Sequence, residues 1–295
     1  MSEPRSTMRG RLRLGCPVWS VAGWVGEFYA TRDRSQWLAE YSSVFETVEG
    51  NSTFYALPDR ATTERWAEQT SGDFRFCWKV PRSISHDASL LDCQSETNEL
   101  IDRLRILQEH DRLGPTLLQL GPAFDATCGD RLIAWLETWP HDMELAVEVR
   151  HADWFDEGRH ERLLDQVLRD HNVSRCLFDS RALFASPPET PAEVASQQRK
   201  PRSPFRATVT NATAMVRFIG RDRIPAIEPW IREWTRQVTA WLEEGLSVYL
   251  FTHAPNDQFA PAFARRFVEV LADQGGPHEL PTWPAERGPR QMELF

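Results

Sequence analysis

The sequence predicts a single (β/α)8 barrel of the TIM type, in which eight parallel strands alternate with helices. Three observations predict this fold class. Short runs of β-branched and aromatic residues alternate with longer amphipathic segments, which is the pattern of βα units. Eight such strand candidates occur along the chain. The length of 295 residues fits one barrel of this kind.

Each strand candidate ends in a loop of Gly, Pro or polar residues, and a helix candidate follows it. The expected strands are residues 12–16, 47–51, 74–80, 116–120, 145–151, 174–179, 215–219 and 247–253. The expected helices are residues 35–41, 62–69, 97–110, 130–139, 159–171, 228–244 and 261–272. The sixth crossover, residues 181–212, carries five prolines, so we expect a long loop with only a short helix at 192–198.

Residues 1–274 are expected to form one barrel domain, because neither a linker nor an internal repeat divides them. The stretch 275–290 is rich in Pro and Gly, so residues 275–295 are expected to be a flexible tail. The chain contains no apolar run near the roughly 20 residues that span a bilayer, and its N-terminus lacks an apolar signal-peptide core. We therefore expect no membrane association.

Charge and cysteine content narrow the class of protein further. The net charge of -9 argues against coating nucleic acid or an acidic membrane by bulk charge alone. The five cysteines are widely spread and include no C-x-x-C pair, so they are expected to be reduced thiols. A cytoplasmic location is the simplest expectation.

Most strand candidates end in a hydrogen-bonding or ionisable residue, and Trp19 stands in the loop after the first. The C-terminal ends of the strands form the pocket of a barrel, so these side chains are expected to meet there. The expected pocket residues are Trp19, Glu49, Asn51, Lys79, His86, Gln119, Glu148, Arg150, His151, Asp179, Arg217 and His253. A single polar residue at a strand end is common, but polar residues at the ends of most strands indicate a ligand-binding or catalytic site.

Two kinds of chemistry fit these residue types. In the first, a cationic clamp holds a phosphate or carboxylate, while a carboxylate or an imidazole acts as acid or base. The clamp candidates are Lys79, Arg150 and Arg217. The acid and base candidates are Glu148, Asp179 and His151.

The second chemistry is that of a divalent metal, as in sugar isomerases on barrels. Its candidate ligands are His86, His151, His253, Glu148 and Asp179. The sequence lacks short ligand spacing, and several cations share the same place. We therefore expect no cofactor and rank a metal second.

Structural roles remain open for the same residues. Glu148 and Arg150 are two apart on a strand and point the same way, which allows a buried ion pair without any chemistry. Asp179 can cap the following loop through an Asx turn. Trp19 can stack on a sugar or a base, or pack under the barrel rim.

At these residues the chain resembles the YecE-like family, domain-of-unknown-function family 72. The matching motifs are GCPVWS at 15–20, VEGNSTFY at 48–55, FCWKVP at 76–81 with ISH at 84–86, LQL at 118–120, VEVRH at 147–151, DSR at 179–181, RFIG at 217–220 and THAP at 252–255. The resemblance implies a TIM-type barrel and no established reaction. Barrels of similar shape include sugar isomerases and abasic-site endonucleases, which is an analogy of fold. The wider family often has an Asn pair where this chain has Thr252-His253.

The last five residues resemble the pentapeptide with which bacterial proteins bind the DNA polymerase sliding clamp. The residues that would contact the clamp are Gln291, Met292, Leu294 and Phe295. Such a peptide inserts its Leu and Phe into an apolar pocket while Gln hydrogen-bonds at the rim. An ordinary frayed terminus is the alternative. Clamp binding would favour a DNA-associated role such as repair, with a basic loop for phosphates formed by Arg199, Lys200, Arg202 and Arg206.

The sequence therefore favours an enzyme, a hydrolase or lyase, that acts on a small anionic or nucleic-acid-derived substrate containing a phosphate or phosphodiester. The competing class is a non-catalytic protein that holds an anionic ligand in the same pocket. A metal-dependent enzyme similar to sugar isomerases is the third hypothesis.

Overall fold

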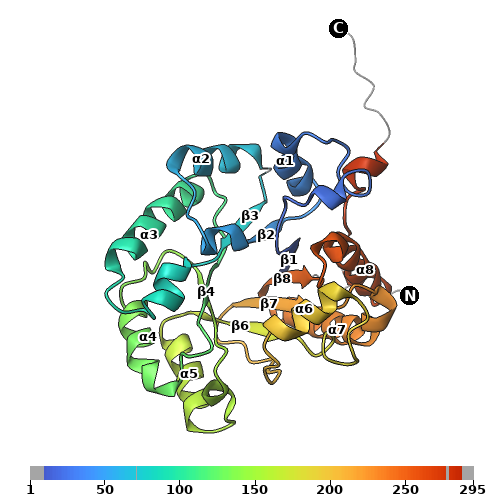
Figure 1. The fold of residues 1–295 in the computed structure, drawn as a ribbon. Coiled ribbons are helices and arrows are strands. Elements are labelled where there is room, and N and C mark those ends of the chain that lie inside the picture. The colour runs from blue at the N-terminus through green and yellow to red at the C-terminus, as the bar shows by residue number, and fades with distance from the viewer. Residues whose placement is uncertain (1–9, 71, 277–278, 288–295) are drawn as a thin grey trace, which may run out of the picture.

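A computed structural model describes residues 10–70, 72–276 and 279–287, and these form the predicted barrel (Figure 1). Eight parallel strands run in the order β3-β2-β1-β8-β7-β6-β5-β4. They are β1 (Arg11–Cys16), β2 (Thr47–Gly50), β3 (Arg75–Trp78), β4 (Thr116–Gln119), β5 (Leu145–Glu148), β6 (Ser174–Asp179), β7 (Thr213–Ile219) and β8 (Ser247–His253). All eight match the strands expected from the sequence, with shifts of a few residues at their ends.

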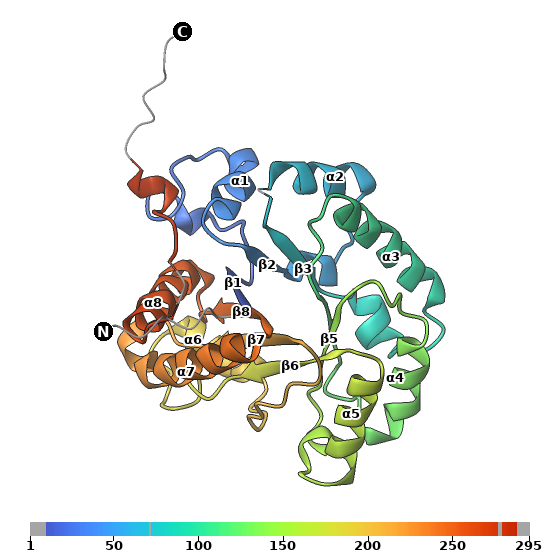
Figure 2. The ribbon, with the colours of Figure 1, turned by 180° about the vertical axis from the view of Figure 1, so that it is seen from behind.

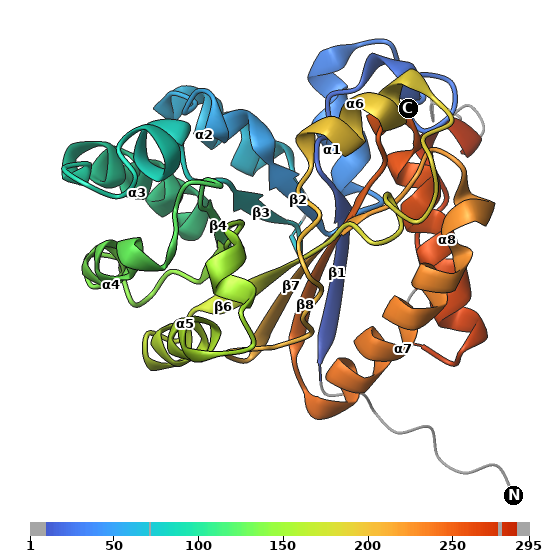
Figure 3. The same ribbon diagram turned by 60° about the horizontal axis from the view of Figure 1, so that its bottom comes forward.

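Helices surround the strands on the outside, as the views from the two opposite sides show (Figures 1 and 2), except for the helix of the sixth crossover, which lies across one end of the barrel (Figure 3). They are α1 (Trp37–Ser42), α2 (Arg60–Gln69), α3 (Gln94–Glu109), α4 (Gly129–Leu136), α5 (Arg159–Asp170), α6 (Pro191–Arg199), α7 (Glu228–Glu244) and α8 (Ala260–Asp273). Short turns of helix precede several of them. None of these helices is long and apolar enough to cross a membrane.

Local sequence signals explain where individual helices begin and end. The side chain of Asp59 accepts a hydrogen bond from the backbone N–H of Thr62 and so caps α2. Thr190 caps α6 in the same way, with Pro191 at the first helical position. Helix α7 ends at Gly245, whose φ of 93° is a left-handed conformation that glycine adopts without a steric penalty.

The barrel is nearly closed, and its seam lies between β3 and β4. Only isolated bridges join these strands, such as the pairing of Lys79 with Leu117. The Val80 backbone N–H donates to the Leu117 carbonyl at 2.9 Å, and the Gly114 N–H donates to Phe76 at 2.9 Å. At the other strands the ladder is continuous.

Side chains that point alternately inward and outward divide the apolar core into two parts. The inner part fills the barrel with Cys77, Leu117, Ala146, Cys176, Met215, Tyr249 and Phe251. The outer part lies between the strands and the helices and is rich in aromatic residues. All five cysteines are buried and free, which agrees with the expected reduced thiols.

The irregular sixth crossover lies at the end of the barrel where the strands end, with α6 across the top of the view in Figure 3. It is fixed by a buried ion pair in which Arg221 Nη2 donates to Glu193 Oε2 at 2.6 Å. The Ser180 hydroxyl donates to the Pro201 carbonyl at 2.9 Å. The crossover therefore has a defined position over the pocket, although its prolines predicted mainly loop.

The C-terminal segment differs from the flexible tail that we expected from residue 275 onward. Residues 279–287 include a helical turn, Pro284–Glu286, and the indole of Trp283 is only 5% exposed. The Arg265 guanidinium stacks on that indole at 3.3 Å, and the Ala285 N–H donates to the Phe28 carbonyl at 3.1 Å. The apolar Trp283 anchors this segment against the barrel. The pentapeptide at 291–295 lies outside the described residues.

Candidate functional site

Buried polar side chains gather at the C-terminal end of the barrel, which we call the barrel mouth. They are Glu49, Lys79, Gln119, Glu148, Arg217 and His253, and each is at most 6% exposed. All but Glu49 stand two residues beyond an apolar residue that faces into the barrel, and Glu49 stands two beyond the buried Thr47. The alternation of each strand therefore aims these side chains at the barrel axis. The structure brings these six strand ends together at one end of the barrel.

Arg217 is the hub of this cluster. Its Nε and Nη2 atoms donate to the two carboxylate oxygens of Glu49, both at 2.8 Å, and its Nη1 donates to Glu148 at 2.5 Å. Burial alone would raise the pKa of Glu148, but the charges of Arg217 and Arg150 lower it to about 2. At Glu49, too, burial alone would raise the pKa, but the charge of Arg217 and the hydrogen bonds from His253 and Arg217 lower it. Both carboxylates are therefore ionised at neutral pH, and Arg217 is already neutralised.

Gln119 supplies a single amide oxygen to three cations. Lys79 Nζ and Arg150 Nη2 each donate to Gln119 Oε1 at 2.8 Å, and Arg217 Nη1 lies 3.4 Å from it. The Nε of Arg150 also donates to Glu148 at 2.7 Å, so the predicted ion pair between residues two apart is present. A neutral oxygen can satisfy only part of the hydrogen-bonding capacity of these groups.

The Lys79 side chain is buried without a carboxylate partner among the described residues. Its ammonium lies 4.2 Å from the ring centroid of Phe54 and donates to Gln119. Burial, together with the charge of Arg217, lowers the pKa of Lys79 to about 7. The amine is therefore close to half neutral at physiological pH.

Lys200 follows α6 directly and reaches the barrel mouth from the sixth crossover. Its ammonium lies 6.0 Å from the ring of Phe178, and no described residue forms a hydrogen bond or ion pair with it. Burial and the charge of Arg217 lower the pKa of Lys200 to about 8. The sequence placed Lys200 only in a basic surface loop. Nothing in its local pattern shows that this loop folds back over the pocket.

One predicted histidine, His253, belongs to this cluster, and another, His86, lies close enough to be affected by the charge of Lys79. His253 Nε2 lies 2.9 Å from Glu49 Oε2, and burial lowers the pKa of His253 to about 4 despite that carboxylate, so the neutral ring donates to Glu49. Burial and the charge of Lys79 lower the pKa of His86 to about 4. The His86 ring packs edge-on against Phe54 at 5.0 Å. Both rings are neutral at physiological pH.

His151 lies at the rim rather than in the cluster. Its Nδ1 accepts a hydrogen bond from the backbone N–H of Asp153 at 3.2 Å and caps the helical turn Ala152–Phe155. About a third of its side chain is exposed. The ring is therefore free to meet a ligand only from the solvent side.

Asp179 points away from the barrel mouth. Its neighbour Phe178 faces the axis, so Asp179 faces the helices, where Trp234 Nε1 donates to it at 2.8 Å. It also accepts from the backbone N–H of Arg181 at 3.0 Å and from the Arg181 guanidinium at 3.0 and 2.9 Å. The Asx turn that the sequence allowed is present, and no carboxylate oxygen is left for the pocket.

A cleft of about 570 Å³ opens beside Glu49 at the barrel mouth. It is lined by Pro17, Val18, Trp19, Ser20, Glu49, Asn51, Ser52, Tyr55 and Trp66. The Trp19 ring packs edge-on against Trp66 at 5.0 Å, while Tyr55 is 80% exposed. Asn51 donates to the Pro17 carbonyl at 3.0 Å and joins the two loops that form the walls. Trp19 therefore both packs under the rim and borders open space.

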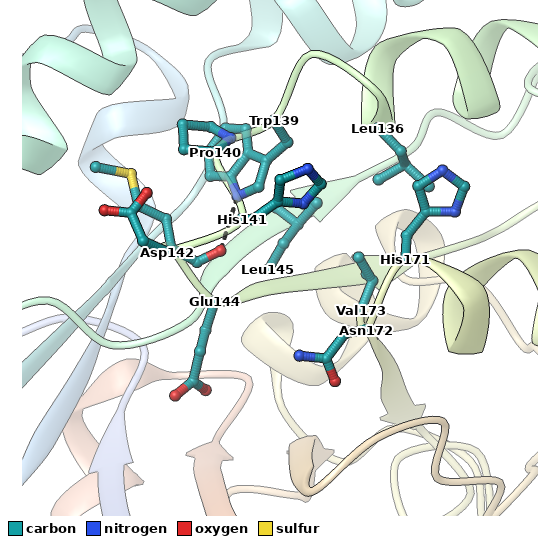
Figure 4. A pocket seen from close by; sticks show the side chains of 11 residues that line it. Leu136, Trp139, Pro140, His141, Asp142, Glu144, Leu145, His171, Asn172 and Val173 are labelled. Atoms are coloured by element: carbon teal, nitrogen blue, oxygen red, sulfur yellow. Dashed lines mark hydrogen bonds between the residues drawn. The ribbon is translucent and has the colours of Figure 1, made fainter.

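A second hollow of about 260 Å³ lies at the opposite end of the barrel, in the loops that precede β5 and β6 (Figure 4). His141 and His171 line it with Trp139, whose indole N–H donates to the Met143 carbonyl at 3.0 Å. None of the predicted pocket residues lines it. The face that carries function in barrels is the other one.

The described residues contain no group of three or more His, Cys, Asp and Glu side chains placed to hold a metal ion. Of the five candidate ligands, Glu148 is paired with Arg217 and Arg150, His151 caps a turn and Asp179 faces the helices. The candidate ligands are therefore dispersed in this structure.

Comparisons with known proteins agree with the fold and with the motifs. A family model described as "Protein of unknown function DUF72" matches residues 13–287. The UPF0759 protein YecE of Escherichia coli K12 is 35% identical over 258 residues, which cover 88% of this chain and 92% of that protein. The UPF0759 protein YunF of Bacillus subtilis 168 is 26% identical over 200 residues, covering 65% and 64% of the two chains.

Two solved structures share the architecture. A DUF72 family protein from Enterococcus faecalis V583 superposes with a TM-score of 0.68 at 17% identity, covering 92% of this chain and 98% of that one. A DUF72 family protein from Thermotoga maritima MSB8 gives 0.66 at 23% identity, covering 88% and 99%. At these identities the likeness concerns the fold.

Proposed function

The chain belongs to the DUF72 family, and we propose that it is an enzyme that acts on a phosphate- or phosphodiester-containing substrate at the barrel mouth. The observation that supports this most directly is the sharing of the Gln119 oxygen by Lys79, Arg150 and Arg217. Buried cations that share one neutral acceptor have donor capacity left for an anion.

The balance of charges at the barrel mouth supports the same proposal. Two ionised carboxylates, Glu49 and Glu148, face four basic side chains when both lysines are protonated. Because Arg217 is satisfied by the carboxylates, the binding groups are Lys79, Arg150 and Lys200. A phosphate held by these groups would lie in a largely buried site, where charge-assisted hydrogen bonds are strong.

Acid-base roles follow from the placement of the candidates. Glu148 is ionised and fixed by Arg217 and Arg150, which suits it to stabilising positive charge or orienting Arg150. His151 is the imidazole at the rim and serves as proton acceptor for a substrate that enters from solvent. Asp179 holds Arg181 and the start of the sixth crossover and supports the site at a distance.

Binding and turnover can be tested separately. Isothermal titration with sulfate and with a panel of sugar phosphates should show binding to the wild-type protein. Arg150→Gln should weaken it about 10-fold or more, because a charged hydrogen-bond partner is lost. Arg232→Gln, an exposed change on α7, is the matched control. Equal affinity in all three proteins would remove the anion site.

A non-catalytic anion-binding protein is the alternative, and Glu148→Gln distinguishes the two. An enzyme should keep its ligand but lose turnover of the phosphorylated substrate or of a chromogenic phosphodiester. If no member of the panel is turned over by wild-type protein that binds it, the alternative gains support. A metal-dependent enzyme would need stoichiometric metal in the purified protein, which elemental analysis measures.

We further propose that the pentapeptide Gln291–Phe295 binds the bacterial sliding clamp and brings the enzyme to DNA. Its sequence pattern supports this. The double substitution Leu294→Ala with Phe295→Ala should abolish retention of the protein on an immobilised clamp, while Glu293→Ala should not. Equal retention of all forms would contradict clamp binding.

A further inference from the structure

Lysine is very rare in this chain, and both lysines lie at the barrel mouth. Of the 34 Lys and Arg residues, only Lys79 and Lys200 are lysines, and the other 32 are arginines. Both interact electrostatically with Arg217, Glu49, Glu148 and Arg150, although more than a hundred residues separate them in sequence. Arginine serves at every other basic position, on the surface and in buried ion pairs alike.

Amine chemistry is what distinguishes these two positions from the other basic ones. A guanidinium stays protonated at any physiological pH and is a poor nucleophile, whereas an ε-amine loses its proton when it is desolvated. A position that only needs positive charge can be filled by Arg, as the rest of this chain shows. A lysine buried in this pocket therefore supplies what the arginines cannot, an amine that can lose its proton and act as a nucleophile.

The surroundings of Lys79 are those of a lysine nucleophile. The side chain stands at the C-terminal end of β3, is 6% exposed and donates to the neutral Gln119 rather than to a carboxylate. The Phe54 ring covers the amine at 4.2 Å, and the guanidinium groups of Arg217 and Arg150 are nearby. Burial and the neighbouring guanidinium groups lower the pKa of Lys79, and they outweigh the Phe54 ring face and the charges of Glu49 and Glu148, which favour the ammonium. Desolvation and nearby cations activate lysines that form Schiff bases.

We propose that Lys79 condenses with the carbonyl group of an aldehyde or ketone whose phosphate is held by Arg150 and Lys200. This rests on the proposed anion site and names the substrate class for it, a phosphate-bearing carbonyl compound.

The condensation needs no other reactant. The lone pair of the neutral Lys79 nitrogen forms a bond to the carbonyl carbon, and the carbonyl oxygen takes a proton to give a carbinolamine. The carbon–oxygen bond then breaks, and the oxygen leaves as water with both hydrogens of the amine. The product is an imine between Lys79 and the substrate carbon, which becomes a cationic electron sink when it is protonated.

The low lysine content simplifies the test, because few amines in the protein can form an adduct. The full-length protein is incubated with D-glyceraldehyde 3-phosphate and sodium cyanoborohydride, which reduces an imine to a stable amine. Intact mass then counts the adducts. Peptide mapping assigns them among Lys79, Lys200 and the N-terminal amine. We expect the adduct mainly on Lys79, and no Lys79 adduct in Lys79→Arg protein that keeps the wild-type circular dichroism and melting temperature.

Two comparisons show whether the phosphate directs the reaction. Unphosphorylated D-glyceraldehyde should label Lys79 more slowly, and sulfate should compete with the phosphorylated probe. Lys200→Arg keeps the positive charge and should preserve the labelling of Lys79, whereas Lys200→Ala should slow it for the phosphorylated probe alone. Labelling of Lys79 no faster than that of Lys200 would overturn the proposal.

A second trapping experiment distinguishes a free sugar phosphate from a nucleic acid as the carbonyl substrate. A DNA oligonucleotide with one abasic site carries an aldehyde next to phosphodiesters, and reductive trapping would give a covalent protein–DNA complex visible on a gel. Trapping of the oligonucleotide but not of the sugar phosphate assigns a nucleic-acid substrate, and the reverse assigns a free sugar phosphate. If sulfate binds but neither probe reacts with Lys79, the inference fails while the proposed anion site stands.

Discussion

Arg217 and Glu49 are 168 residues apart in sequence and form a two-bond ion pair at the centre of the barrel mouth. Glu148 completes the set on the other side of the guanidinium. All three side chains are buried, so their charges depend on one another. The ion pair joins β2 to β7 across the barrel. It holds in place the buried side chains that lie beneath the proposed anion site.

Removing the hub should destabilise the fold strongly. Arg217→Met leaves the buried Glu49 without its cation and Glu148 with Arg150 alone, and breaking such a buried pair costs about 3–5 kcal/mol. Urea unfolding followed by circular dichroism measures the free energy of unfolding. Arg232→Met on the exposed face of α7 should change it by less than about 0.5 kcal/mol. A similar small effect of Arg217→Met would show that the cluster does not stabilise the barrel.

Adding a negative charge at Gln119 should compete with the ligand. Gln119→Glu is nearly isosteric and places a carboxylate where Lys79 and Arg150 now share an amide oxygen. The pKa of Lys79 should rise, and sulfate affinity measured by titration calorimetry should fall about 10-fold or more, since a tenfold change corresponds to only about 1.4 kcal/mol. Gln94→Glu at the exposed start of α3 should leave affinity unchanged. Unchanged affinity in Gln119→Glu would place the anion elsewhere.

Anion binding should weaken as pH rises through neutrality. The pKa of Lys79 is lowered to about 7 and that of Lys200 to about 8, so both ammonium groups are charged at pH 6 and largely neutral at pH 9. Sulfate stays a dianion over this range, so a change in its affinity with pH reflects titration of groups on the protein. In Lys79→Arg the part of the decline near pH 7 should disappear, because a guanidinium does not titrate there. A flat profile for the wild type would argue against lysine contacts with the anion.

Asp179→Asn separates support of the fold from contact with the ligand. The change weakens the interaction with Arg181 but leaves an oxygen for Trp234, so stability should fall by about 1–3 kcal/mol. Sulfate affinity should stay within about twofold of the wild type, because the side chain faces the helices. Loss of binding with unchanged stability would return Asp179 to the list of ligand-contacting residues.

The orientation of Asp179 shows what strand alternation can predict. The inward series Cys176 and Phe178 places Asp179 on the outer face, and this periodicity is present in the sequence. We selected pocket residues because they are polar and stand at strand ends, without checking this alternation. That selection placed Asp179 in the pocket together with Glu148. The same rule identified buried residues of the barrel mouth correctly where the polar residue also falls on the inward-facing side of its strand, as at Lys79 and Arg217.

Other features depend on contacts that no local pattern contains. Lys200 reaches the barrel mouth because Glu193 pairs with Arg221 and Ser180 bonds to the Pro201 carbonyl, contacts that hold α6 over the strands. The anchoring of residues 279–287 depends on Arg265 and Phe28, both distant in sequence. Composition predicted loops in both places. The apolar Trp283 was the one local sign that the second is packed.

The anchored turn at 284–286 limits how far the pentapeptide can extend. The last described residue before it is Arg287, and only residues 288–290 separate that residue from Gln291. The four Cα-to-Cα steps from Arg287 to Gln291 span at most about 14 Å even when fully extended. A clamp bound to Gln291–Phe295 would therefore lie close to this part of the barrel, because no long flexible linker separates the two. If the proposed clamp binding holds, it would set the orientation of the protein on DNA as well as its local concentration.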